Sequence, residues 1–135
     1  MADVWYDKAL TAFGKKTIDL VNDTIIFIAL TSGYTFSQSH QYISDLGANI
    51  VGRTSGLGSK TMGSVAEGVF DAADSTFSAL TGSTVTQLVM AKDTGNDATS
   101  PLLLQATSAK YTGLPFTPTG ADVPLIFPAA GIGKL

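Results

Sequence analysis

Residues 69–105 read VFDAADSTFSALTGSTVTQLVMAKDTGNDATSPLLLQ, and three candidate strands stand in this stretch between turn-forming residues. The first, residues 76–80, alternates between apolar and polar side chains, and the TGS triplet at 81–83 suits a short connection. The second, residues 84–92, keeps the period of two that a pleated strand requires. We therefore predict a hairpin between these two strands, and a third strand that begins at Pro101, an edge position where a missing N–H costs least.

Apolar runs outside this stretch predict further strands. Residues 25–30, IIFIAL, form an unbroken apolar run rich in β-branched side chains, which is typical of a strand buried on both faces. A short strand is expected at residues 48–51, after a single helical turn within 41–46. The last strand, residues 123–127, is interrupted by Pro124, so we place it at the edge of a sheet.

The first sixteen residues carry the pattern of an amphipathic helix. Its apolar stripe recurs at spacings of three and four and contains Trp5, Ala9, Ala12 and Phe13, widened by Tyr6 and Leu10. Asp3 is a suitable N-cap, and Gly14 is a suitable stop. We therefore predict a helix over residues 1–16. The stripe either packs on the protein's own sheet or docks on another subunit.

Glycine-rich segments separate the predicted strands. Residues 52–68 contain five glycines among Ser and Thr, and we expect a long loop or mobile arm that becomes ordered only against a neighbour. A second loop is expected over residues 106–120. The elements together predict one mainly β domain spanning 1–135. Its β portion, residues 17–135, is expected to form an antiparallel β-sandwich or a barrel-like fold that follows one short N-terminal helix.

Composition narrows the possible partners. The chain has 8 basic and 11 acidic residues, a formal charge of −3, so no basic field is present to hold nucleic acid. Its longest apolar run is far shorter than the ~20 residues that span a bilayer, and we predict no membrane segment. Only 14% of the residues are charged while 44% are hydrophobic, which predicts that much of the surface is buried against partners.

One tripeptide resembles a catalytic motif. Asp93-Thr94-Gly95 is the tripeptide of aspartic proteases, and a homodimer could pair two such carboxylates to share one proton. Its flanking residues, Lys92 and Asn96, replace the small or apolar neighbours expected in a catalytic loop. We therefore predict a polar turn between two strands and no catalytic residue.

Three other motifs contain residue types that could bind a ligand. Residues 56–61 resemble the end of a phosphate-binding loop, but Ser59 stands between the glycine and the lysine. His40 is the only histidine, so a histidine metal cluster is excluded, and we expect a hydrogen-bonded or exposed loop residue. Two aspartate pairs fit no known calcium-loop spacing; they are Asp71 with Asp74 and Asp93 with Asp97. We predict no cofactor and no metal.

The order and spacing of these elements resemble a family of small virion proteins of tailed bacteriophages. The resemblance covers nearly the whole chain, and no single element is diagnostic. The matching motifs are VWYDKAL at 4–10, IDL at 18–20, DTIIFIAL at 23–30, the aromatic-rich segment 34–40, YISDL at 42–46, the glycine loop, VFDAAD at 69–74, KDTG at 92–95, SPL at 100–102 and the closing GI at 131–132.

The resemblance implies a non-enzymatic virion structural protein of the capsid decoration, or cement, type. Such a protein binds the lattice of the major capsid protein on the outside of the head and is assembled in the host cytoplasm. We expect a homo-oligomer, with a trimer favoured. A head-to-tail (neck) or tail component is the alternative, and a homodimeric aspartic hydrolase using Asp93 is a remote one.

Partner contacts are expected on two surfaces. The predicted helix presents an apolar stripe that needs only a hydrophobic partner, and the glycine-rich loop would become ordered across the joint between subunits. The candidate contact residues are Trp5, Leu10 and Phe13 from the helix, and Arg53, Leu57 and Lys60 from the loop.

Overall fold

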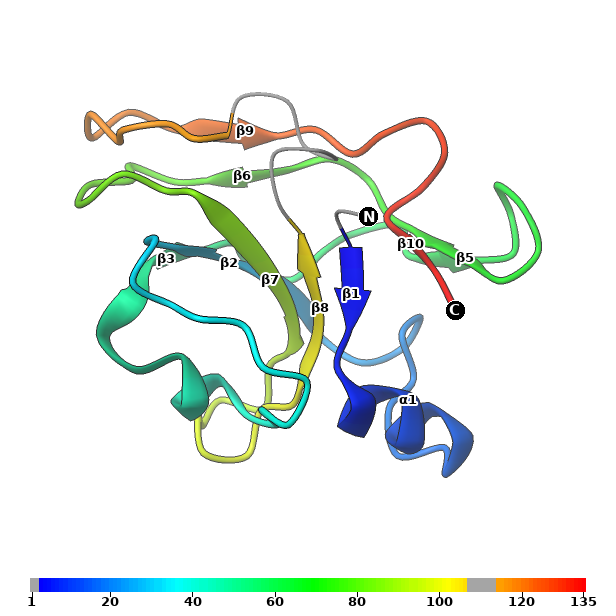
Figure 1. Ribbon diagram of the computed structural model, residues 1–135. Helices are drawn as coiled ribbons and strands as arrows, with labels where there is room; N and C mark the ends of the chain where they lie inside the picture. The colour runs from blue at the N-terminus through cyan, green and yellow to red at the C-terminus, as the bar shows by residue number, and fades with distance from the viewer. Residues whose placement is uncertain (1–2, 107–113) are drawn as a thin grey trace.

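The computed structural model describes residues 3–106 and 114–135. Its centre is a five-stranded antiparallel sheet with the strand order β1-β8-β7-β2-β3 (Figure 1). These strands are β1 (Asp3–Trp5), β8 (Leu102–Ala106), β7 (Gln87–Lys92), β2 (Ile25–Leu30) and β3 (Ile50–Arg53). The chain is thus mainly β with antiparallel sheets.

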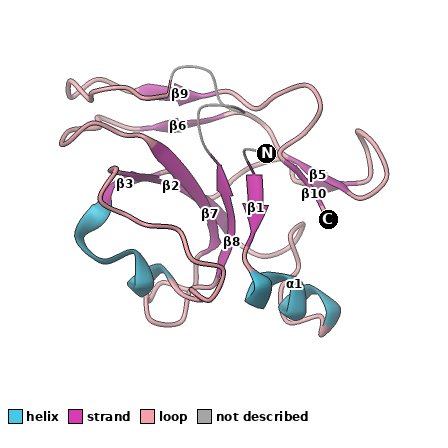
Figure 2. Ribbon diagram, in the orientation of Figure 1, coloured by secondary structure: helices cyan, strands magenta, loops and turns pink. Residues whose placement is uncertain are grey.

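Two smaller sheets and two short helices accompany the central sheet (Figure 2). One small sheet has the order β10-β5-β4, and the other pairs β6 with β9. Their strands are β4 (Thr61–Met62), β5 (Val69–Asp71), β6 (Ser75–Phe77), β9 (Val123–Leu125) and β10 (Gly133–Lys134). The helices are α1 (Asp7–Gly14) and the 3₁₀ helix η1 (Ile43–Asn49). Within the described residues the three sheets stay separate and do not close into a barrel.

Strand β2 is the centre of the core, as its apolar run predicts. All six of its residues are buried, and it pairs along its whole length with β7, from Ile25 opposite Lys92 to Leu30 opposite Gln87. Phe27 is fully buried, and its ring packs on Phe127 with 5.3 Å between centroids. The prediction that this strand is buried on both faces is confirmed.

Buried polar side chains tie the aromatic segment after β2 to the sheet. The hydroxyl of Tyr34 lies 2.8 Å from both the Tyr6 hydroxyl and Nδ1 of His40, so this histidine is hydrogen-bonded, as expected. Gln87 donates through Nε2 to the carbonyl of Tyr34 at 2.9 Å and accepts from Gln105 at 2.9 Å. These bonds satisfy polar groups that would otherwise be costly to bury.

The predicted helix over residues 1–16 is shorter than expected, and part of that prediction is wrong. Residues Asp3–Trp5 form β1 and pair with β8, while the helix covers only Asp7–Gly14. Tyr6, fully buried and extended at φ −70° and ψ 140°, separates the two elements. Burying Tyr6 and adding a strand beside β8 outweighs the helical propensity of these residues. Residues 1 and 2 lie outside the described part.

The predicted hairpin between residues 76–80 and 84–92 is also wrong. Strand β6 pairs with β9, and β7 lies between β2 and β8. Val85, just before β7, exchanges two backbone hydrogen bonds with Phe116 at 2.8 and 3.0 Å. Because residues 87–91 are all buried, β7 needs a neighbour on each side, and these long-range pairings win over the local turn.

The glycine-rich segment 52–68 is ordered against its own chain, which corrects the prediction of a loop that needs a neighbour. The backbone of Thr54 donates to the carbonyl of Phe27 at 2.9 Å, and the Thr54 hydroxyl accepts from the Phe27 amide at 3.0 Å. The amide of Leu57 then donates to the carbonyl of Ile25 at 2.8 Å. Residues 54–57 thus continue the hydrogen bonding along the edge of β2 beyond the end of β3.

The remaining sequence predictions concern the C-terminal third. Of the loop predicted over 106–120, residues 107–113 lie outside the described part. Strand β9 is shorter than the predicted 123–127, and Pro124 lies opposite Thr76 in a two-stranded sheet, an edge position as expected. Over the residues described, no helix is long and apolar enough to cross a membrane.

Candidate interaction surface

Trp5 of β1 links helix α1 to β10, through aromatic packing on one side and a hydrogen bond on the other. Ala9 lies on the buried face of the helix. The ring of Phe13 packs edge to face against the ring of Trp5, with 5.6 Å between the ring centroids. The indole Nε1 of Trp5 donates to the carbonyl of Lys134 at 2.8 Å. The N-terminal elements β1 and α1 and the distant strand β10 therefore form one corner of the molecule.

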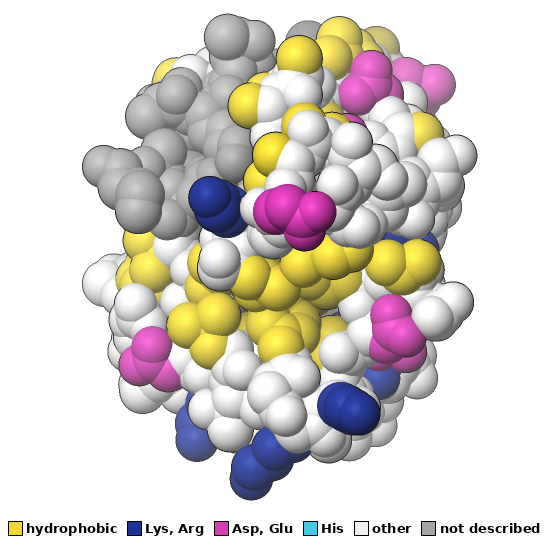
Figure 3. All heavy atoms as spheres, turned by 90° about the vertical axis from the view of Figure 1, so that its right-hand side faces the viewer, with side chains coloured by type: hydrophobic (Ala, Val, Ile, Leu, Met, Phe, Trp, Pro, Cys, Tyr) yellow, Lys and Arg dark blue, Asp and Glu magenta, His cyan; other side chains and the backbone are white. Residues whose placement is uncertain are grey.

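An open apolar groove of about 350 Å³ lies beside this corner. It is lined by Phe13, Lys16, Ile18, Asp19, Leu20, Val21, Met62 and Leu135. Ile18 and Leu20 are buried, while Val21, Met62 and Leu135 are 38%, 39% and 47% exposed. Figure 3 shows hydrophobic side chains gathered across the middle of this face, with Lys and Arg side chains along its lower side. Exposed apolar surface of this kind is typical of contact sites.

The wall of the groove that contains Val21 is held in place by carboxylates. Asp19 accepts hydrogen bonds from the amides of Val21 and Asn22 at 3.0 and 3.1 Å, and from the Asn22 side chain at 2.7 Å. The hydrogen bonds from Asn22 hold the pKa of Asp19 below its usual range. Asp23 accepts from the Asp19 amide at 2.8 Å and pairs with Lys92 at 3.1 Å. The groove is therefore preformed, which lowers the entropy cost of binding.

Of the contact residues predicted on the N-terminal helix, only some face this surface. Phe13 lines the groove, and Leu10, one helical turn earlier, is 44% exposed on α1. Trp5 belongs to β1 and not to the helix, and its indole N–H is taken by the carbonyl of Lys134. Trp5 supports the groove from behind by packing against Phe13.

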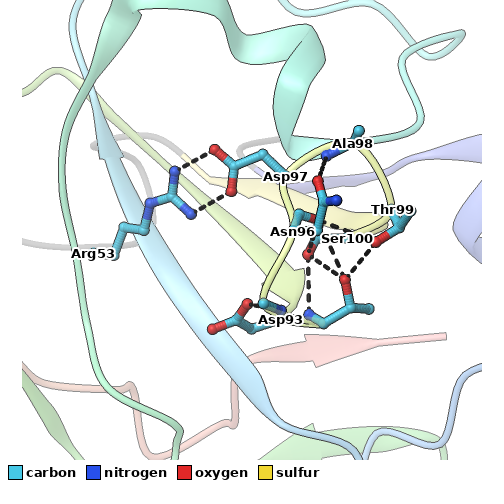
Figure 4. Close-up of polar contacts among 9 residues, drawn as sticks. Arg53, Asp93, Asn96, Asp97, Ala98, Thr99 and Ser100 are labelled. Carbon is cyan, nitrogen blue, oxygen red and sulfur yellow. Dashed lines mark hydrogen bonds and ion pairs between the residues drawn. The ribbon is translucent and has the colours of Figure 1, made fainter.

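The contact residues predicted in the glycine-rich loop are not brought together with the groove. Leu57 is buried in the core, at 6% exposure, and presents no side chain to a partner. Arg53 forms a two-pronged ion pair with Asp97, with both N–O distances 2.7 Å (Figure 4), and the guanidinium holds the pKa of Asp97 below its usual range. Lys60 donates to the backbone carbonyl of Asp23.

Residues 93–100 form a hydrogen-bonded turn between β7 and β8 (Figure 4). Asp93 accepts from the amide of Gly95 at 2.8 Å, the local bond of an Asx turn. The hydroxyl of Ser100 accepts from the Thr94 amide at 3.0 Å. The tripeptide that resembles a protease motif thus has a structural role as a turn.

We expect Asp93→Asn to leave peptide hydrolysis unchanged and to alter the melting temperature little. An asparagine Oδ1 can still accept the hydrogen bond from the Gly95 amide, so the turn is retained. Hydrolysis of a peptide mixture at acidic pH, followed by mass spectrometry, checks this. Cleavage by the wild-type chain that the variant lacks would instead support the aspartic hydrolase.

Of the four aspartates considered as calcium ligands, Asp74, Asp93 and Asp97 have partners, whereas Oδ1 of Asp71 is buried without a hydrogen-bond partner among the described residues. Asp74 accepts from the amide of Phe127 at 2.9 Å, and Asp97 is paired with Arg53. Over residues 3–106 and 114–135, no three His, Asp or Glu side chains are grouped so as to hold a metal ion.

Most of the groove carries no signal in the sequence. Val21, Met62 and Leu135 come from three separate segments, and Met62 and Leu135 stand among polar or small residues. No periodic pattern links them, so only the fold could bring them together. The surplus of hydrophobic over charged residues was the one available signal that apolar surface is exposed somewhere.

Comparison with protein-family models and with curated proteins finds no match for this chain. A functional assignment therefore depends on the surface just described and on the resemblance of the sequence pattern.

Proposed function

We propose that the protein is a virion structural protein of a tailed bacteriophage that decorates the capsid and binds the lattice of the major capsid protein. The observation that carries this proposal is the preformed apolar surface made by the groove and by Leu10 of α1. A rigid, sparsely charged β-rich body with one such surface is suited to bridging joints between shell subunits. The sequence resemblance to phage virion proteins supports the same assignment.

The proposed action is mechanical and needs no catalytic residue. Each copy would bury its apolar surface against the shell and against neighbouring copies on it, and rupture or expansion of the shell would then require these contacts to be broken. A stable contact buries about 1,000 Å² or more in total, so the groove and Leu10 would be parts of a wider interface. The buried apolar centre of this interface would supply most of the affinity, and the polar residues around it would supply shape complementarity and exclude water.

The remaining expectations belong to this proposal. The protein would lie on the outside of the head, act as a homo-oligomer with a trimer favoured, and bind neither nucleic acid nor membrane. In the finer description of the fold, the β6–β9 pair and the β4, β5 and β10 strands would serve as the second layer of a sandwich over the central sheet. The packing of Phe127, which follows β9, on Phe27 of β2 supports that arrangement.

A reconstitution experiment tests the proposal. Purified wild-type protein is added to phage heads stripped of it, and bound copies are counted by quantitative mass spectrometry. We expect hundreds of copies per head, and at least a tenfold loss of affinity for the double variant Leu10→Asp, Met62→Asp, because a charge at a buried interface position is not compensated. Ile126→Asp, which alters a side chain 66% exposed and outside the groove, is the matched control and should bind as wild type.

The copy number separates the proposal from its alternative. A neck or tail component would be present in about six to twelve copies, as ring symmetry at one vertex dictates. Wild-type binding by the double variant would show that the groove and Leu10 do not form the contact.

A further inference from the structure

The loop between β4 and β5 presents an apolar side chain and an acid together. Residues 64–67, SVAE, are all exposed, and Val65 is 43% exposed. Two backbone hydrogen bonds hold the loop, from Gly63 to the carbonyl of Val69 at 2.9 Å and from Val69 to that of Ala66 at 3.1 Å. Figure 1 shows this loop extending from the body beyond β5. We call residues 64–67 the SVAE loop.

The charges on the SVAE loop and on the groove are complementary and unpaired. The ion pairs found over residues 3–106 and 114–135 involve neither Glu67 of the loop nor Lys16 at the groove. The acid at the groove, Asp19, already accepts three hydrogen bonds within its own turn. With respect to the described residues, the groove therefore offers a positive charge without an ion-pair partner beside apolar side chains, and the loop offers such a negative charge beside Val65.

We propose that the groove receives the SVAE loop of a second copy of this chain, with Val65 between the apolar walls and Glu67 against Lys16. The proposal rests on the proposed function in that it gives the copy-to-copy contact of the decorating layer. It leaves Leu10 and the outer side of α1 for the shell.

The place of the loop in the fold favours a second copy as the occupant. Met62 lines the groove and ends β4, so the SVAE loop begins directly at the groove's edge. A two-fold axis near Met62 would therefore bring each copy's loop to the other copy's groove at the same time. A groove of about 350 Å³ has room for a few side chains of a projecting loop and not for a flat protein face.

This contact is expected to be weak between free molecules. It buries a small area, in the range of transient complexes. On a shell that holds neighbouring copies at a high effective concentration, the same contact becomes effective without any new interaction. Copies of the protein would then associate with one another chiefly when they are already bound to the shell.

Disulfide trapping tests the contact directly, because the natural chain has no cysteine. Two single-cysteine variants, Val65→Cys and Val21→Cys, are mixed under mild oxidation, and the crosslinked heterodimer is followed on a non-reducing gel. We expect it to form at least about ten times faster than the heterodimer of Val65→Cys with Ile126→Cys, since docking raises the local thiol concentration. Ile126 is the more exposed position, at 66% against 38% for Val21, so equal or reversed rates would overturn the proposal.

A charge exchange tests the register of the contact. Lys16→Glu or Glu67→Lys, added to both cysteine variants, should each slow the trapping about threefold or more, because like charges then meet. The double exchange should restore the rate, and failure to restore it in folded protein would overturn the pairing. Unchanged melting curves for the single exchanges establish that the effect is not unfolding.

The trapping assay uses the purified chain alone and no shell. Absence of trapping together with hundreds of copies on heads would remove this inference and leave the capsid function standing. Specific trapping without binding to heads would do the reverse. Equal binding of the Val21 and Ile126 variants to anionic vesicles, with no selective crosslink, also counts against the second copy as occupant.

Discussion

Phe27→Ala is expected to lower the free energy of unfolding by about 3 to 5 kcal/mol. Phe27 is fully buried in β2, the strand that lies between β7 and β3, and its ring packs on Phe127. Truncation removes the burial of an aromatic ring and leaves a cavity that the surrounding strands cannot close, because both backbone edges of β2 are hydrogen-bonded to neighbours. The loss is a large part of the 5 to 15 kcal/mol by which a domain is typically stable.

Urea unfolding followed by circular dichroism measures this effect. The matched control is Ile126→Ala, which truncates a side chain 66% exposed and should change the free energy of unfolding by less than about 0.5 kcal/mol. Phe27→Leu leaves a smaller cavity. A decrease in the free energy of unfolding between those of Ile126→Ala and Phe27→Ala would show that the destabilisation follows the volume removed. If Phe27→Ala unfolds at the wild-type urea concentration, β2 is not the centre of the core.

Gly131→Ala is expected to destabilise the fold by about 2 to 4 kcal/mol. Gly131 has φ +95°, a conformation that side chains rarely adopt, and an added Cβ would collide with Cγ1 of Val69 and approach the Phe70 carbonyl to 3.3 Å. Relief requires β10 to move away from β5. That movement would also displace Leu135 and open the groove.

Gly95→Ala is a close control for this variant. Gly95 has a similar φ of +86°, but an added Cβ would meet no atom within 4 Å. It should therefore cost about 1 to 2 kcal/mol for the backbone strain alone. The difference in melting midpoint between the two variants isolates the collision with β5. Equal losses would show that β10 shifts at no cost.

The parts of the fold that could be predicted are those in which a local pattern and the tertiary environment agree. The run at 25–30 and the strands near 87–92 and 102–106 are mostly apolar and almost wholly buried because they pair with neighbours in the middle of the sheet. The hairpin from 76 to 92 failed because its first strand pairs with β9, which is 46 positions further along at Val123↔Phe77. Local turn chemistry carries no signal of such a distant partner.

The N-terminal prediction failed for a different reason. Trp5 and Phe13 do contact each other, as a helical stripe would suggest, but Trp5 reaches Phe13 from a strand that turns into the helix at Tyr6. Spacing alone cannot distinguish these two geometries over so few residues. Apart from Phe13, the groove could not be predicted, because its exposed walls come from apolar residues in segments that the fold alone unites.

The hydrogen bond from Trp5 to the carbonyl of Lys134 joins residues 129 positions apart. The walls of the groove likewise come from Val21, Met62 and Leu135, so they are separated by most of the sequence. A chain misfolded in any of these three regions would not display the complete groove. Assembly through this surface would therefore select for correctly folded copies, because a copy misfolded in any of the three regions would lack part of the contact.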